Sequence, residues 1–440
     1  MMGVRVADEP VSRAGERTLA RSELLAYGAL RAPLALMELP LFVLLPAFYS
    51  REAGLSLALV GGLLFAARSL DALADPVIGA WIDRSRGRWS YRAWIYLALP
   101  ALVAGFCALL APPLDLPRAM MATWLVLASA LTYLAWSTVT IAHQAWGAEL
   151  GGARQTRVRV TGYREACGLA GVLLSALLLD PDQSLALIAA FIVATTLSAA
   201  LLARAPLPHA PESPDRARPS TLRQLLLQPW SLVRSDARFA RLLAIFMING
   251  IASALPATLV LFFVADVLGA KAQAPLFLLA YFAAAAVGMP AWVHLGARIG
   301  ARPAWLVGML ASIAAFTWAF MLGQGDLLAF GLICVVTGLA LGADLAMPPA
   351  LLAAVIADSS ARAEREGAAF GVWALVTKLN LAAAAGLGLP LLAVLGYEPA
   401  SPSGSTLALS LAYAVLPCCF KLIAAVTLWR STDLEPSQSR

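Results

Sequence analysis

The sequence predicts an all-α membrane protein in which twelve transmembrane helices form two six-helix bundles. Three observations support this: an apolar composition, about twelve long apolar segments, and basic residues gathered in alternate loops. Hydrophobic residues make up 60% of the chain and charged residues only 13%, whereas a soluble domain carries roughly a quarter charged residues. A single water-facing core cannot hide so much apolar surface, so we expect a lipid environment.

Each predicted span is a segment of about 20 mostly apolar residues, which is long enough to cross the hydrocarbon core as a helix. The first six predicted spans are residues 24–48, 56–82, 92–112, 119–146, 161–180 and 184–204. The second six are residues 239–265, 273–296, 302–322, 327–357, 366–394 and 405–429. The first apolar segment is too long for a signal-peptide core, so we expect it to remain as an uncleaved span.

Arginine marks alternate loops and thereby predicts the orientation. One set of loops holds Arg84, Arg86, Arg88, Arg92, Arg154, Arg157, Arg159, Arg298, Arg302, Arg362 and Arg365. The intervening loops hold only Arg51, Arg118 and Lys271. Because basic loops stay cytoplasmic, we expect both termini on the cytoplasmic side of a cytoplasmic (inner) membrane. The net charge of +6 follows this loop pattern, so we expect membrane lipid and no nucleic acid as a partner.

The longest interruption between spans divides the chain into two halves. It is rich in proline from Pro206 to Pro214, which favours a loop. We therefore predict an N-terminal six-helix bundle over residues 1–204, a cytoplasmic linker over residues 205–238 and a C-terminal six-helix bundle over residues 239–440. A weak repeat supports this division, because Gly79 and Gly296 each stand before a basic cluster in corresponding loops.

Span two carries ionisable residues at membrane depth. Arg68, Asp71 and Asp75 are spaced i, i+3, i+7 and so share one helical face. Each such group costs at least about 2.5–3.5 kcal/mol to insert, so it is a functional candidate by default. Two carboxylates one turn apart offer oxygen ligands to a monovalent cation, or share a proton. We expect Arg68 to neutralise the pair in part when no cation is bound.

The alternative is a buried ion-pair network that only fixes helix packing. Two acids with a single base leave one charge uncompensated, which favours a cation site. The coupling ion, Na+ or H+, stays open, and we expect no other metal or cofactor.

Other polar groups inside the predicted spans are candidates for binding a solute. They are Arg31 and Glu38 in span one, Asp344 in span ten, and Lys378 and Asn380 in span eleven. Trp136 and Trp373 have rings that can stack on a solute. By contrast, Lys421 is interpreted as a lysine that snorkels to the membrane interface, and Asn249 as a contact between helices.

The stretch from Arg68 through Asp71, Asp75 and Pro76 resembles the glycoside–pentoside–hexuronide:cation symporters of the major facilitator superfamily. Its loop motif follows at Gly79, Asp83, Arg84 and Arg88. Weaker matches extend over essentially the whole chain. The resemblance implies the major facilitator fold and alternating access between the two bundles.

The resemblance also implies roles for single residues. Asp71, Asp75 and Ser137 fall on the cation-binding positions of the family. Lys378 matches a lysine implicated in coupling and Arg164 an arginine of span five, which together with Arg68 form the predicted coupling set.

The sugar site departs from the pattern of the family. Two aspartates that hold the sugar in galactoside carriers fall at Ala35 and Thr140 here. Neither side chain can accept a pair of hydrogen bonds from sugar hydroxyls as a carboxylate does. Glu38 is three residues from Ala35 and is a candidate replacement on the same face, and Thr140 remains a candidate contact.

The leading functional prediction is a monomeric secondary transporter, a cation-coupled symporter of a small organic solute. A sugar or glycoside follows from the resemblance. The alternative is a carrier of an amphiphilic, lipid-like or organic-anion solute held by Asp344, Arg31 and Glu38. A third class, an intramembrane enzyme or a receptor, is disfavoured because the sequence contains no GxSxG or HExxH motif.

Overall fold

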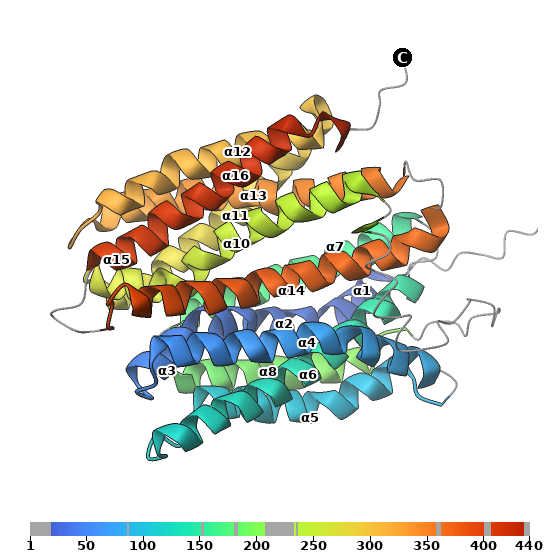
Figure 1. Ribbon diagram of the computed structural model, residues 1–440. Helices are drawn as coiled ribbons and strands as arrows, with labels where there is room; N and C mark the ends of the chain where they lie inside the picture. Colours follow the sequence, from blue (N-terminus) through green and yellow to red (C-terminus); the bar gives the residue numbers. More distant parts are fainter. Residues whose placement is uncertain are drawn as a thin grey trace, which may run out of the picture.

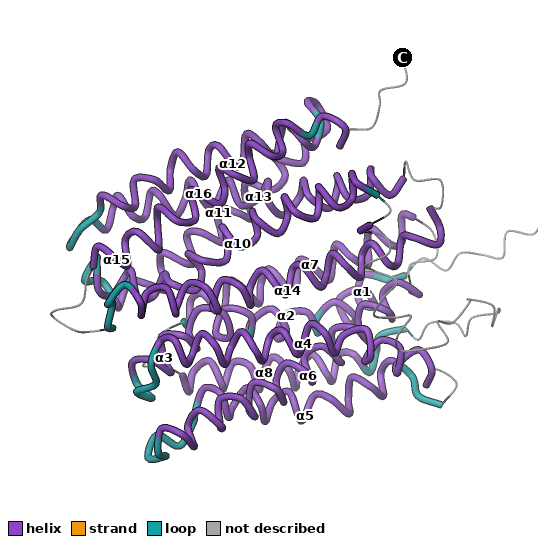
Figure 2. The backbone as a smooth tube through the Cα atoms, in the orientation of Figure 1, coloured by secondary structure: helices purple, strands orange, loops and turns teal. Residues whose placement is uncertain are grey.

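The computed structural model describes residues 19–85, 88–150, 154–179, 184–206, 233–234, 236–357, 362–399 and 406–434. Within these residues every regular element is a helix (Figure 2). Most of the predicted linker, residues 207–232, lies outside the described residues. The all-α prediction is confirmed.

The helices of the N-terminal part follow the predicted spans closely. They are α1 (Arg21–Gly28), α2 (Arg31–Leu36), the π-helix η1 (Pro40–Leu44), α3 (Leu45–Arg51), α4 (Leu57–Ser85), α5 (Tyr91–Leu110), α6 (Arg118–Leu150), α7 (Arg154–Leu178) and α8 (Ser184–Leu202). The first predicted span is therefore one run of four short helices, residues 21–51.

The C-terminal part continues the pattern. Its helices are α10 (Ala237–Asp266), η3 (Lys271–Gln273), α11 (Ala274–Ile299), α12 (Ala301–Phe316), η4 (Thr317–Met321), α13 (Leu327–Ala357), α14 (Arg362–Val394), α15 (Thr406–Ser410), the π-helix η5 (Leu411–Val415), α16 (Leu416–Arg430) and η6 (Thr432–Leu434). The last predicted span is likewise a run of α15, η5 and α16.

Eleven helices or joined runs in the described part of the chain are long and apolar enough to cross a membrane. Helix α7 is the predicted span that is not among them, although it has 25 residues. It carries Arg154, Arg157, Arg159, Arg164 and Glu165, which lower its mean hydropathy. It nevertheless packs along α2 and contacts α11, so it occupies a place inside the helical assembly.

The helices form two groups in space (Figure 1). Helices α1 to α8 lie on one side, and α10, α11, α12, α13 and α16 on the other. Helix α14 lies between them, where it packs against both α4 and α10. A change in the position of α14 would therefore alter contacts with both helix groups.

Glycines allow α14 to approach its neighbours closely. A Cβ atom at Gly61 of α4 would lie 2.8 Å from the carbonyl oxygen of Ala385, and one at Gly386 would lie 2.8 Å from the Phe65 ring. On the other flank, a Cβ at Gly250 of α10 would overlap the Asn380 amide. Because side chains at these positions would separate the backbones, the glycines set how far α14 stands from α4 and α10.

The π segment η1 releases a backbone carbonyl into the core. The Leu45 N–H donates to the Pro40 carbonyl, five residues earlier, and the next residue, Pro46, has no N–H to donate. The Leu41 carbonyl is therefore left without a helical donor, and it accepts a hydrogen bond from Arg68 at 2.7 Å. In η5 the Leu416 N–H likewise donates to the Leu411 carbonyl, and Pro417 follows.

A second contact ties the two groups at the end of the first span. Arg51, at the end of α3, pairs with Asp266, at the end of α10, at 2.8 Å. The Tyr397 hydroxyl donates to the same carboxylate. In the predicted orientation this end lies away from the arginine-rich loops.

We predict that Gly61→Ala lowers the thermal stability of the purified protein, because its new methyl group overpacks the α4–α14 contact. Overpacking of this kind costs roughly 1–3 kcal/mol. Gly62→Ala is the matched control, since nothing lies within 4 Å of its added Cβ. Differential scanning fluorimetry of both variants checks this, and equal melting temperatures would contradict the close packing of α4 and α14.

Candidate functional site

One lysine joins three helices at the centre of the molecule. The Lys378 ammonium, on α14, lies 2.8 Å from an oxygen of Asp71 and 2.6 Å from an oxygen of Asp75, both on α4. It also donates to the Ser137 hydroxyl on α6 at 2.7 Å. Ser137 in turn donates to the other oxygen of Asp71 at 2.7 Å. We call these four residues the Lys378 cluster.

The Lys378 cluster is withdrawn from solvent. Asp71 is 4% exposed, and the side chains of Lys378 and Asp75 are 22% and 23% exposed. The ammonium donates hydrogen bonds to Asp71 and Ser137 and forms an ion pair with Asp75. The Trp136 ring centroid lies 5.9 Å from the ammonium, which adds a cation–π contribution.

Arg68 does not take the place expected for it. It is buried and donates to the carbonyls of Leu41 and Leu381 at 2.7 and 2.8 Å, and to the Tyr133 hydroxyl. No ion pair joins Arg68 to Asp71 or Asp75 in the described structure, where Lys378 pairs with both. The local count is therefore two acids and two bases, and the uncompensated charge inferred from span two alone is absent.

Unused oxygen atoms remain beside the Lys378 cluster. The second carboxylate oxygen of Asp75 is buried and has no hydrogen-bond partner among the described residues, and the same is true of the Thr140 hydroxyl. Thr140 follows Ser137 by three residues on α6 and so lies on the same face. Carboxylate and hydroxyl oxygens are the ligands that hard cations prefer, so the surroundings of the cluster contain free acceptors for one.

A second network lies within the C-terminal group. Lys421 of α16 donates to Asp344 of α13 at 2.7 Å and to Asn249 of α10 at 2.9 Å. Asp344 also accepts from Asn249, Trp305 and Ser253. The interpretation of Lys421 as a snorkelling residue is wrong, since its side chain is only 8% exposed and pairs with Asp344.

The remaining substrate-binding candidates are dispersed. Arg31 and Glu38 pair with each other at 2.7 Å on the first run of helices. Trp373 stacks on Phe246 with 3.7 Å between the ring centroids, so one face of its ring is covered. Asn380 is buried beside Gly250 and its carbonyl oxygen has no partner in the described part.

The other coupling and loop candidates lie outside the Lys378 cluster. Arg164 pairs with its neighbour Glu165 at 2.6 Å. Gly79 and Arg84 belong to the last turns of α4, and Arg88 is exposed just after it. The side chain of Asp83 is outside the described residues.

Sequence reasoning missed Lys421, Trp305 and Tyr133 as partners of buried charges. A signal was available for the first of these, because an acid at the depth of Asp344 requires a base on another span. Trp305 and Tyr133 gave none, since an aromatic residue in a span usually packs against apolar neighbours.

The fold matches solved structures of membrane transporters. The nucleoside transporter NupG aligns over 94% of this chain and 99% of its own, with a TM-score of 0.69 and 12% identity. A bacterial homologue of the human lysosomal transporter Spinster gives a TM-score of 0.69 with 14% identity, over 95% of this chain and 98% of its own. A D-xylose-proton symporter gives 0.63 with 13% identity, over 93% and 96%.

Two curated relatives match in sequence. The inner membrane symporter YicJ of Escherichia coli (strain K12) is 30% identical over 136 residues, which are 30% of this chain and 29% of the relative. The uncharacterized symporter sll1374 of Synechocystis sp. (strain ATCC 27184 / PCC 6803 / Kazusa) is 29% identical over 175 residues, 35% of this chain and 29% of the relative. The match thus spans less than a third of either relative.

A family model described as "MFS/sugar transport protein" matches residues 26–435. This match covers nearly the whole chain, including every helix that contributes to the Lys378 cluster. The chain therefore belongs to the MFS/sugar transport protein family, and it is a multi-pass membrane transporter and not an enzyme.

Proposed function

We propose that this transporter is a symporter that couples Na+ or H+ to the movement of a small organic solute. The observation that carries the proposal is the Lys378 cluster, in which a base on the central helix α14 closes onto two acids of α4. The family description and the symporter names of the two relatives support it. We place the protein in a cytoplasmic membrane, as a monomer with both termini cytoplasmic.

In this proposal Lys378 acts as a tethered cation that the coupling ion replaces. Its ammonium is already bonded to Asp71 and Ser137 and paired with Asp75, so an incoming ion competes for all three residues. The unpaired oxygens of Asp75 and Thr140 provide further ligands for Na+. A proton achieves the same exchange by neutralising one carboxylate, which weakens its attraction for the ammonium.

Release of Lys378 alters the contact between the two helix groups. Helix α14 packs against α4 and α10, so loss of the ion pair removes a polar contact from the α4 side only. We propose that the two groups act as the six-helix bundles of residues 1–204 and 239–440, joined by the linker, and alternate access to the site between them. The ion thereby biases which arrangement is stable.

The polar groups around the Lys378 cluster favour a hydroxylated solute. The Trp136 N–H and the Thr140 hydroxyl near the cluster, and the Asn380 carbonyl oxygen on the α10 flank of α14, are all buried without a partner in the described part. An unpaired buried polar group costs free energy, and solute hydroxyls can donate to or accept from each of these three. A sugar or glycoside therefore remains the leading solute class.

We predict that NaCl, compared with choline chloride, changes the fluorescence of Trp136, because Na+ displaces the ammonium that lies over its ring. The signal is the titration of purified wild-type protein minus that of Trp136→Phe. A pH titration in choline tests H+ in the same way. Asp71→Asn with Asp75→Asn should abolish the response to either ion.

The matched control for this titration is Asp326→Asn, which changes an exposed acid immediately before α13 that accepts a hydrogen bond from the Gly323 N–H. It should leave the ion response unchanged. In proteoliposomes, a solute found by a thermal-shift screen of sugars and glycosides should accumulate only under an ion gradient. Full gradient-driven accumulation by the Asp71→Asn, Asp75→Asn variant would refute the cation role.

We also predict that Lys378→Met is strongly destabilising and that adding Asp71→Asn restores part of the loss. Removing one partner of a buried ion pair costs about 3–5 kcal/mol, and the second change removes one of the stranded charges. Thermal unfolding in the same detergent measures both effects. Lys271→Met, at an exposed lysine, is the control, and additive losses in the double variant would contradict direct pairing.

A further inference from the structure

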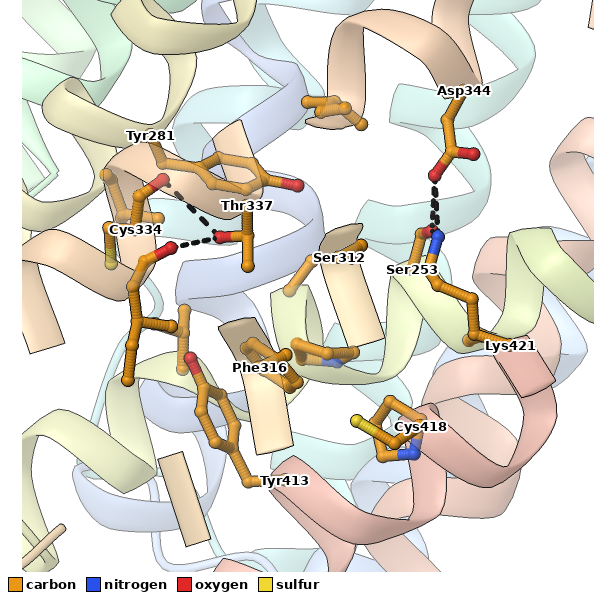
Figure 3. Close-up of a pocket in the computed structure, with 18 of the residues that line it drawn as sticks. Ser253, Tyr281, Ser312, Phe316, Cys334, Thr337, Asp344, Tyr413, Cys418 and Lys421 are labelled. Atoms are coloured by element: carbon orange, nitrogen blue, oxygen red, sulfur yellow. Dashed lines mark hydrogen bonds and ion pairs between the residues drawn. The ribbon is translucent and has the colours of Figure 1, made fainter. Parts of the chain in front are cut away.

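A cavity lies inside the C-terminal helix group, apart from the Lys378 cluster (Figure 3). Residues of α10, α11, α12, α13, η5 and α16 line it, and Val43 of η1 adds one wall residue from the N-terminal group. Its volume is about 100 Å³. Most of the wall is aromatic or aliphatic, including Phe316 and Tyr413.

The charged end of the cavity is already neutral and internally bonded. Lys421 and Asp344 pair at 2.7 Å, and Ser253 lies in hydrogen-bond contact with both. The carboxylate also accepts from Asn249 and Trp305. Because the pair has no net charge and few unused positions, it offers a dipole to a ligand and does not call for a counter-ion.

The remaining polar groups of the cavity are hydroxyls. Those of Tyr281, Tyr413 and Ser312 line the cavity, and none of them has a hydrogen-bond partner within the residues that the structure describes. Figure 3 shows the Tyr281 hydroxyl pointing toward the side of the cavity on which Asp344 lies. These hydroxyls are therefore available to a ligand.

The backbone around the cavity is also unusual. The described part of the chain contains two π-helical segments, η1 and η5, and both contribute a wall residue, Val43 and Tyr413 respectively. Such segments are rare and occur frequently at functional sites.

We propose that this cavity binds an uncharged amphiphile, with a ring-shaped apolar body and one or two hydroxyl groups. The apolar body contacts Phe316 and its aromatic neighbours, while the hydroxyl bonds to Tyr281 near the Asp344–Lys421 pair. This site goes beyond the proposed function, because its wall contains none of the polar groups proposed to contact the transported solute.

Equilibrium dialysis of 2-naphthol against the protein in nanodiscs, with empty nanodiscs subtracted, tests the proposal. We expect saturable binding at one site, and much weaker binding of the anion 2-naphthoate and of naphthalene, which lacks the hydroxyl. Tyr281→Phe should weaken 2-naphthol binding about threefold to tenfold, the value of one hydrogen bond. Ser312→Phe, which fills the cavity, should abolish it.

Tyr96→Phe is the matched control, because it removes a hydroxyl that bonds the Ala199 carbonyl on α8; it should leave binding unchanged. Absence of saturable binding, or equal losses in Tyr281→Phe and Tyr96→Phe variants of normal melting temperature, would overturn the proposal. The Asp71→Asn, Asp75→Asn variant should still bind 2-naphthol. If 2-naphthol binds but Na+ and H+ give no fluorescence response, only the symporter proposal is rejected. If the ion response is present but 2-naphthol does not bind, only the proposal for this cavity is rejected.

Discussion

The ammonium group of Lys378 is the contact on which the rest of the arrangement depends. It carries a positive charge from α14 onto two carboxylates of α4, where neither sign of charge is stable alone at membrane depth. Its reach is set by the glycines that bring the two backbones together, Gly61 and Gly386. Close packing and charge pairing thus act at the same contact between α4 and α14.

Lys421 and Lys378 have contrasting surroundings. Lys421 and Asp344 belong to one helix group, and Asn249, Trp305 and Ser253 saturate the acid. Lys378 bridges two groups and leaves oxygens of Asp75 and Thr140 unpaired nearby. A saturated pair within one group suits a permanent structural role, whereas an incompletely saturated pair between groups suits a contact that is made and broken.

Much of the fold follows from hydropathy, but the partners of its charges do not. Long apolar segments located the spans, and the i, i+3, i+7 spacing placed Asp71 and Asp75 on one face. That spacing also placed Arg68 on the face, yet it could not show that Pro46 frees the Leu41 carbonyl to accept from it. Which neighbour a helical face meets depends on packing between spans, so Lys421 was assigned to the interface in error.

Helix α7 shows that hydropathy can also miss a helix that packs among the spans. Its arginines and Glu165 make it too polar for a span by composition. In the folded protein it packs on α2, which also carries Arg31, whose side chain lies against Gly168. Its place is therefore stabilised by neighbouring helices more than by lipid.

The charge balance around Lys378 has an electrical consequence. Arg68, Asp71, Asp75 and Lys378 together carry no net charge, so in the proposed ion-coupled cycle these four residues add no net charge to the empty form. One added monovalent ion gives the set a charge of +1. A membrane potential then acts on the loaded form alone, by about 2.3 kcal/mol per 100 mV for a full crossing. A membrane potential that is negative inside would thus accelerate the inward step of the ion-loaded form. It would not change the rate at which the empty form returns.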